Sequence, residues 1–157
     1  MIATSRLTVR NLDAADYGAY CQLQSDARVK EFTGGQSSVS AVDYQRFTSA
    51  PSNSCMAVCS KDDGRFIGTC GFREVDARIE LEIFLSPEVQ GQGLGAELFD
   101  AMISYCAITF PNAKVGASAS PSNSRAIKLL ESRGFENTGE TITLKSGFEH
   151  SVYVKFS

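Results

Sequence analysis

Gln90-Gly91-Gln92-Gly93-Leu94-Gly95-Ala96 lies between an apolar run that ends at Leu85 and an amphipathic run that begins at Leu94. This order predicts a strand, a glycine turn and the start of a helix. The first turn of a helix has N–H groups without intrahelical partners and a positive dipole, so anions bind there. Three glycines remove the Cβ atoms that would keep a pyrophosphate away. The segment therefore predicts either an anion-binding loop or an ordinary flexible surface turn.

Strand and helix signals alternate along the rest of the chain. Asp62-Asp63-Gly64 between two apolar runs predicts a hairpin. The strand–helix–strand crossover through residues 78–120 requires a parallel pair, whereas hairpins favour antiparallel pairing, so we expect a mixed sheet in one domain spanning 1–157. Strands are expected at 7–10, 55–60, 65–74, 78–86, 115–120, 135–144 and 151–156, and helices after Asp13, from Ser40 to before Pro51, from Leu94 to before Pro111 and over 124–133.

The composition indicates an ordinary globular domain. The chain has 157 residues, of which 43% are hydrophobic and 21% charged. The net charge of -3 provides no basic field for a polyphosphate backbone, so we expect no nucleic-acid partner. No run approaches the ~20 apolar residues of a membrane helix, and the N-terminus lacks the apolar core of a signal peptide. We expect a cytoplasmic protein without a membrane partner.

The five cysteines and the single histidine, His150, show no metal-ligand spacing. We therefore expect no metal site and predict reduced, mostly buried thiols. His150 precedes the last predicted strand. Although an imidazole invites a catalytic assignment, we favour a structural or acceptor-side role.

Three phosphate-binding motifs compete for the glycine segment. A Walker loop is excluded because no lysine lies between Lys61 and Lys114. Gly91, Gly93 and Ala96 match the dinucleotide pattern G-x-G-x-x-A, but several strands precede them and no acidic residue follows at the required distance. A nucleotide-binding or NAD-binding protein is therefore the least favoured function. The third pattern, Gln/Arg-x-x-Gly-x-Gly/Ala, is typical of coenzyme A sites and is also satisfied.

A second motif lies about 30 residues downstream. Asn123-Ser-Arg-Ala-Ile-Lys-Leu-Leu-Glu-Ser-Arg-Gly134-Phe135 resembles the N-x-x-A/S-x-x-L-x-x-x-x-G-F segment of the GNAT superfamily of acetyltransferases. Residues 4–10 and 79–87 resemble two strands of its ribosomal-protein N-acetyltransferase branch. The resemblance covers most of the chain. It implies an α/β (α+β) three-layer sandwich: a mixed, mostly antiparallel sheet of about seven strands, helices on both faces and a splayed parallel strand pair.

The resemblance also implies an acetyl-CoA site between the strands at 78–86 and 113–120. Amides of the glycine segment would hold the pyrophosphate, and the backbone after Glu82 would pair with the pantetheine arm. Asn123 would bond this arm near its sulfur, or serve only as a helix N-cap. The cofactor-binding residues implied are Ile83, Phe84, Leu85, Gln90, Gly91, Gln92, Gly93, Leu94, Gly95, Ala96 and Asn123.

The chemistry implied is direct attack of a neutral amine on the thioester. Glu80 and Glu82 share one face of their predicted strand, and their repulsion would raise either pKa towards the working range. Which of them is the base stays open. A further alternative is that both glutamates lie on a solvated strand face and have no catalytic role. A backbone N–H near Phe84 or Leu85 would hold the oxyanion. Leu130 occupies a position where many relatives have the tyrosine general acid, so either a serine (Ser118, Ser120 or Ser124) replaces it or the thiolate leaves unassisted.

The sequence thus predicts an acetyl-CoA-dependent N-acetyltransferase that acts on a primary amine, either a small molecule or a peptide or protein N-terminus. The alternative is a non-catalytic acyl-CoA-binding module, which the leucine at position 130 keeps open. Acceptor contacts are expected from residues 13–50 and from the loop before the last strand. The identity of the acceptor is left open, as is assembly into a homodimer.

Overall fold

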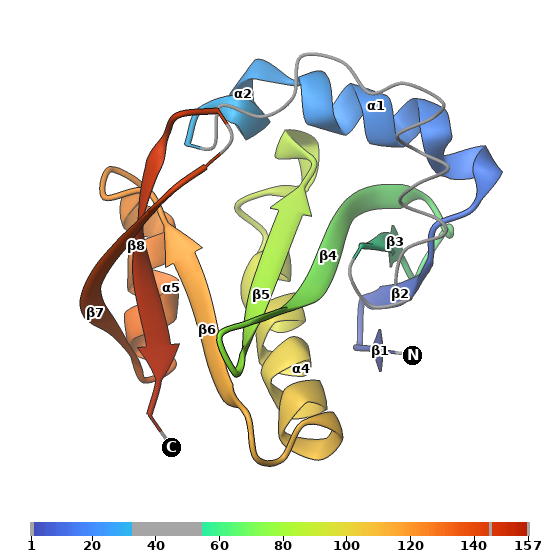
Figure 1. Ribbon diagram of the computed structural model, residues 1–157. Helices are drawn as coiled ribbons and strands as arrows, with labels where there is room; N and C mark the ends of the chain where they lie inside the picture. Colours follow the sequence, from blue (N-terminus) through green and yellow to red (C-terminus); the bar gives the residue numbers. More distant parts are fainter. Residues whose placement is uncertain (1, 33–54, 145, 157) are drawn as a thin grey trace.

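A mixed sheet forms the centre of the structure, a computed structural model that describes residues 2–32, 55–144 and 146–156 (Figure 1). In this part of the chain eight strands lie in the order β1-β2-β3-β4-β5-β6-β8-β7, and all neighbours are antiparallel except β5 and β6. The predicted mixed sheet is confirmed, with the short β1 added to the seven strands expected. The strands are β1 (Ile2–Ala3), β2 (Leu7–Asn11), β3 (Met56–Ser60), β4 (Phe66–Val75), β5 (Arg78–Leu85), β6 (Lys114–Ala119), β7 (Phe135–Thr143) and β8 (Glu149–Lys155).

The helices of the described part fall into an early and a late group. The early group is the 3-10 turn η1 (Ala14–Asp16), α1 (Tyr17–Ser25) and α2 (Ala27–Lys30); the late group is the 3-10 turn η2 (Pro87–Val89), α4 (Leu94–Thr109) and α5 (Ser124–Ser132). The helix predicted from Ser40 lies outside the described residues. None of the described helices is long and apolar enough to cross a membrane.

Capping side chains set the start of the early helices. Asp13 accepts a hydrogen bond from the Ala15 N–H at 2.8 Å, and Asp16 accepts one from the Asp13 N–H at 2.9 Å, which completes a capping box. The buried Asp16 carboxylate also accepts two hydrogen bonds from Arg10 of β2. The helix predicted after Asp13 is therefore present, although its first turn is 3-10. α2, which we expected as a continuation of this helix, is separate and begins where Asp26 caps it.

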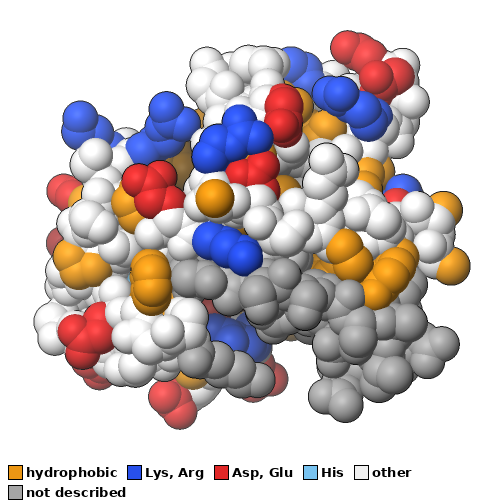
Figure 2. All heavy atoms as spheres, turned by 90° about the horizontal axis from the view of Figure 1, so that it is seen from above, with side chains coloured by type: hydrophobic (Ala, Val, Ile, Leu, Met, Phe, Trp, Pro, Cys, Tyr) orange, Lys and Arg blue, Asp and Glu red, His pale blue; other side chains and the backbone are white. Residues whose placement is uncertain are grey.

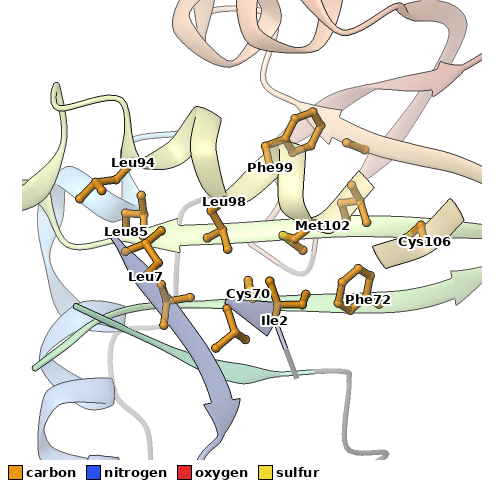
Figure 3. Close-up of a cluster of buried hydrophobic side chains, with 14 of the residues drawn as sticks. Ile2, Leu7, Cys70, Phe72, Leu85, Leu94, Leu98, Phe99, Met102 and Cys106 are labelled. Carbon is orange, nitrogen blue, oxygen red and sulfur yellow. The ribbon is translucent and has the colours of Figure 1, made fainter. Parts of the chain in front are cut away.

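Helices cover both faces of the sheet, as the sandwich prediction requires. On one face, Leu98, Met102 and Cys106 of α4 are fully buried against β-strand residues such as Leu85 and Phe72 (Figure 3). This spacing of four residues, about one helical turn, explains why one side of α4 is apolar. α1 lies against the opposite face. Burial of this apolar set fixes the position of α4 and, with it, of the loop that precedes α4.

The parallel pairing of β5 with β6 ends at the partners Glu80 and Gly116. Both strands continue, β5 over residues 81–85 and β6 over 117–119. Beyond the last partners β5 still pairs with β4, and β6 still pairs with β8. The edges of β5 and β6 that face each other are thus left open, which is the splayed pair that the resemblance to the GNAT superfamily implies. We call the opening between 81–85 and 117–119 the strand gap.

Candidate active site

The glycine segment connects β5 to α4 at the wide end of the strand gap. The Gln90 side chain donates to the Leu85 carbonyl oxygen at 3.0 Å and so fastens the loop to the end of β5. Gly91 and Gly93 have φ angles of +79° and +80°, a region in which a Cβ is strained. Gly93 is the N-cap of α4, and no side chain of the described residues caps this helix. The strand, glycine turn and helix start lie where the sequence predicts them, and anion binding stays a prediction.

The predicted cofactor-binding residues differ in how far they are exposed. Gln90, Gly91, Gln92 and Gly93 are exposed, whereas Gly95 and Ala96 are half-buried. The Leu94 side chain is buried in the core, so only its backbone can serve a ligand. On β5, Leu85 is buried, and the two residues before it, Ile83 and Phe84, are half-buried.

Arg6 fastens the glycine segment to the turn between β1 and β2. Its Nη1 donates to the Gln92 carbonyl oxygen at 2.9 Å, and its Nε donates to Glu97 Oε2 at 2.7 Å. Thr4 Oγ1 donates to Glu97 at 2.5 Å, and this hydrogen bond, together with those from Arg6, lowers the pKa of Glu97 to about 2. We call this contact the Arg6–Glu97 latch. Sequence reasoning did not single out Arg6, although it lies in the motif at residues 4–10.

Glu80 lies at the closed end of the strand gap in an ion pair. Arg78 Nε donates to Glu80 Oε1 at 2.6 Å, and the two side chains are 16% and 10% exposed. A Cβ on Gly116 would lie 3.2 Å from the same carboxylate oxygen, so Glu80 also packs against β6. Arg78, rather than Glu82, is therefore the charged partner of Glu80. The alternation of β5 puts Arg78 and Glu80 on one face, a signal that the sequence already contained.

Glu82, on the part of β5 that is not paired with β6, lines a small pocket beside the strand gap. The pocket has a volume of about 60 Å³ and lies between α1, which supplies Tyr20 and Gln24, and the β4–β5 pair, which supplies Thr69 and Phe84. Crowding by these neighbouring groups weakens the hydration of the carboxylate and raises the pKa of Glu82, while Arg73 opposes the shift. The residue is nevertheless accessible to solvent. A carboxylate with a raised pKa and access to water is suited to accept protons.

Two cysteines, Cys55 and Cys70, adjoin the same pocket. Burial raises the pKa of each thiol to about 12. Because the thiolate is the nucleophilic form, neither side chain is suited to carry an acyl group. Cys59, Cys70 and Cys106 are buried and all five cysteines are free thiols, which confirms the prediction of reduced, mostly buried cysteines.

The described part of the face at the α1–α2 end of the sheet carries acidic and basic side chains next to each other (Figure 2). Arg28 of α2, for example, contacts Asp26 at 2.9 Å and Glu88 of η2 at 3.1 Å. Such pairs cancel each other's field beyond a few ångströms of the surface. Attraction of a charged ligand therefore depends on individual groups such as Glu82.

Comparison with known proteins identifies the family of this chain. Residues 6–136 match the family model described as an acetyltransferase (GNAT) domain. The chain belongs to the GNAT acetyltransferase family. Membership of this family makes the protein an acyltransferase. The match does not confirm the narrower resemblance to ribosomal-protein N-acetyltransferases.

Relatives of this acetyltransferase share the fold over nearly its full length. The chain is 27% identical over 146 residues to a Bacillus licheniformis protein named uncharacterized N-acetyltransferase p20, covering 87% of this chain and 82% of that one. A GNAT-family acetyltransferase structure from Bacillus anthracis aligns with a TM-score of 0.80 at 18% identity, covering 98% and 96% of the two chains. Spermidine N-acetyltransferase from Vibrio cholerae, in complex with CoA and spermine, aligns with a TM-score of 0.79 at 19% identity, covering 96% and 94%.

Two positions of this GNAT acetyltransferase that the sequence singled out lie at α5. Asn123 is its N-cap and accepts a hydrogen bond from the Ala126 N–H at 3.2 Å, so the helix-cap role is present and a contact with pantetheine stays a prediction. Leu130 is 4% exposed and belongs to the apolar core. A hydroxyl is therefore missing at this position, and its surroundings are apolar.

Ser118 and His150 form a hydrogen-bonded pair on β6 and β8. Ser118 Oγ lies 3.1 Å from His150 Nδ1, and His150 Nε2 lies 2.8 Å from the Phe32 carbonyl oxygen. His150 is 6% exposed, and Ser118 is half-buried. The pair thus links β6, β8 and Phe32, the second residue after α2. These contacts tie His150 to two neighbouring segments, and the choice between a structural and an acceptor-side role stays a prediction.

Proposed function

We propose that this acetyltransferase transfers an acetyl group from acetyl-CoA directly to a primary amine. The observation that carries the proposal is the strand gap, whose wide end adjoins the glycine segment. An extended ligand with amide groups can pair with the open strand edges as an added strand does. An anionic group at its end then meets the uncapped N-terminus of α4 and the exposed amides of the loop.

The dimensions of the gap suit coenzyme A. The five residues 81–85 span about 16 Å at roughly 3.3 Å per residue. The pantetheine arm, with about a dozen bonds between phosphate oxygen and sulfur, extends to about 15 Å. With the pyrophosphate at Gln90 to Ala96, the thioester reaches the neighbourhood of Glu82. A backbone N–H near Phe84 is then in range of the developing oxyanion.

Glu82 is our candidate for the general base. An alkylamine with a pKa near ~10 is mostly protonated at pH 7 and must lose a proton before it attacks. Glu82 has a raised pKa, reaches solvent and lines the pocket beside the gap. Glu80 is held by Arg78 at the closed end and is less suited to receive a proton. We assign Glu80 a structural role, in which its carboxylate neutralises the charge of Arg78 between β5 and β6.

The acceptor that suits this pocket is the narrow end of an unbranched amine. A volume of about 60 Å³ holds about four water-sized groups and admits the unbranched end of an aminoalkyl chain. One structural relative is named a spermidine N-acetyltransferase and was crystallised with spermine, whose ends have this shape. The amine end of a lysine-like or polyamine-like chain therefore ranks ahead of a branched peptide N-terminus.

The test is release of free thiol from acetyl-CoA in the presence of linear diamines, polyamines and N-terminal peptides. Glu82→Gln is expected to lower kcat at pH 7 by about 100-fold, because general base catalysis contributes at least this much, and to leave the KM for acetyl-CoA within twofold. Glu80→Gln is the matched control and is expected to change stability more than kcat.

Two outcomes would contradict the proposal. Binding of acetyl-CoA in calorimetry without transfer to any amine would favour a non-catalytic acyl-CoA-binding module. A larger loss of kcat in Glu80→Gln than in Glu82→Gln would move the base to the closed end of the gap.

A further inference from the structure

Ser118 stands opposite Glu82 across the strand gap. Glu80 and Gly116 are the last paired positions of β5 and β6, and they share one face, because a Cβ on Gly116 would lie 3.2 Å from the Glu80 carboxylate. Side chains alternate along a strand, so the next positions on this face are Glu82 on β5 and Ser118 on β6. A carboxylate and a hydroxyl therefore flank the gap from its two sides.

The hydrogen bonds of His150 determine whether the Ser118 hydroxyl donates or accepts a hydrogen bond. The Phe32 carbonyl oxygen can only accept, so His150 Nε2 carries a proton and donates it across the 2.8 Å contact. In the neutral imidazole Nδ1 is then an acceptor, and the Ser118 hydroxyl donates to it across 3.1 Å. The lone pairs of Ser118 Oγ are left for a ligand in the gap. When Nδ1 is protonated the direction reverses, and the Ser118 O–H becomes available as a donor.

The other candidates for a proton donor are less suited. Leu130 carries no hydroxyl. Ser120 Oγ lies 2.9 Å from Ser122 Oγ and also accepts from the Ser122 N–H, so it is occupied within its turn. Ser124 is the exposed first residue of α5. Of these three candidate serines, only Ser118 contacts an imidazole in the described structure.

We propose that Ser118 and His150 form a proton relay that moves a proton from the attacking amine to the leaving sulfur. This inference rests on the function proposed above. Ser118 is the catalytic residue of the relay. His150 acts through it as a positioning residue and holds the proton between the two steps.

The step balances without any further reactant. The amine nitrogen bonds to the carbonyl carbon, and the π electron pair moves to the oxygen. The nitrogen, now cationic, gives a proton to Ser118 Oγ, whose own proton passes to His150 Nδ1. The oxyanion pair then re-forms the C=O bond as the C–S bond breaks, the C–S electron pair goes to sulfur, and the proton returns from Nδ1 through Oγ to the sulfur. An amide and a thiol are formed, and Ser118 and His150 are restored.

The first test needs no substrate. His150 is the only histidine in the chain, so ¹⁵N spectra of untagged protein labelled at histidine contain one pair of ring signals. We expect protonated Nε2 and acceptor Nδ1 in the neutral form. Ser118→Ala should shift the Nδ1 signal and leave the tautomer unchanged, because the Phe32 contact remains. A neutral form protonated at Nδ1 would overturn the relay whether or not acetyl transfer is found.

Variants then separate the relay from the tether to Phe32. His150→Gln can keep a donor near the position of Nε2 but has no group at Nδ1, so the tether survives and the relay does not. We expect Ser118→Ala and His150→Gln each to lower kcat by about 100-fold, with the KM for acetyl-CoA within twofold. The double variant should lose no more than either single variant, since the two residues act as one unit. Ser118→Thr, which keeps a hydroxyl, should recover most of kcat.

The matched control is Ser151→Ala, which removes a neighbouring hydroxyl on β8 from the opposite face and should leave kcat unchanged. If the wild-type enzyme is active and Ser118→Ala has the same kcat, the relay is overturned while the proposed function stands. Wild-type kcat in His150→Gln would reduce His150 to a tether and overturn it as well. An inactive wild type would overturn the proposed function and the relay together.

Discussion

The close approach of β4 to β5 at Gly68 leads to a sharp prediction for Gly68→Ala. A Cβ on Gly68 would lie 2.2 Å from the Phe84 carbonyl oxygen and 3.0 Å from Leu85 Cα. Because the first distance is far below any real Cβ contact, the backbone of β5 must retreat by about 1 Å. The displaced residues are those that we place along the pantetheine arm and beside the oxyanion.

Two magnitudes follow from this displacement. Overpacking of this kind costs about 1–3 kcal/mol of unfolding free energy, which corresponds to a melting temperature lower by about 3–10 °C for a chain of this size. A misplacement of about 1 Å at the reacting groups costs up to about 100-fold in rate. Gly68→Ala should therefore lower kcat/KM for acetyl-CoA by about 10- to 100-fold in a protein that is still folded at 25 °C.

The assay is steady-state thiol release, with circular dichroism melting on the same samples. Gly18→Ala in α1 is the control, because no atom lies within 4 Å of its added Cβ and alanine favours a helix. It should keep wild-type kinetics and melt no lower than wild type. Gly68→Ala with wild-type kcat/KM and wild-type melting would refute the close approach and its role in shaping the gap.

Three further predictions concern charged groups. Glu82→Gln should be at least as stable as wild type at pH 7. The raised pKa of Glu82 means that wild type loses stability as pH rises above 4.5. The difference in the free energy of urea unfolding between the two proteins should therefore vanish below that pH. Arg6→Ala should raise the KM for acetyl-CoA about tenfold and leave the KM for acetyl-pantetheine, which lacks pyrophosphate, unchanged. Since the pKa of Glu97 is lowered to about 2, the Arg6–Glu97 latch is lost only as pH falls from 4.5 through that value. The wild-type KM should therefore show no change caused by the latch between pH 5 and 8. Arg78→Met should cost about 3 kcal/mol in urea unfolding by leaving the buried Glu80 carboxylate unpaired, and adding Glu80→Gln should restore most of it; equal stability of the single and double variants would contradict this pairing.

The helices and strands in the described part of the chain follow local signals closely. β5 was predicted over 78–86 and spans Arg78–Leu85, and α4 begins at Leu94 as predicted. These elements are visible in the sequence because alternation, helical spacing, glycine and proline act on neighbouring residues. The short β1 was not predicted, and α2 was expected only as a continuation of α1, since two or four residues carry too little periodicity.

The same distinction between local sequence signals and tertiary contacts applies to the candidate site. Sequence alone determined the glycine segment and the two glutamates on one strand face, because each depends on residues close together in the chain, whereas the open pair of strands was implied by the resemblance to GNAT acetyltransferases. Only the tertiary structure decided which glutamate is neutralised by Arg78 at the closed end of the gap and which one lines the pocket under α1. It also brought Arg6 to Gln92 across 86 positions and His150 to Phe32 across 118. Such contacts leave no local pattern, since burial of the apolar faces of the sheet and helices, rather than the polar residues themselves, sets where these partners meet.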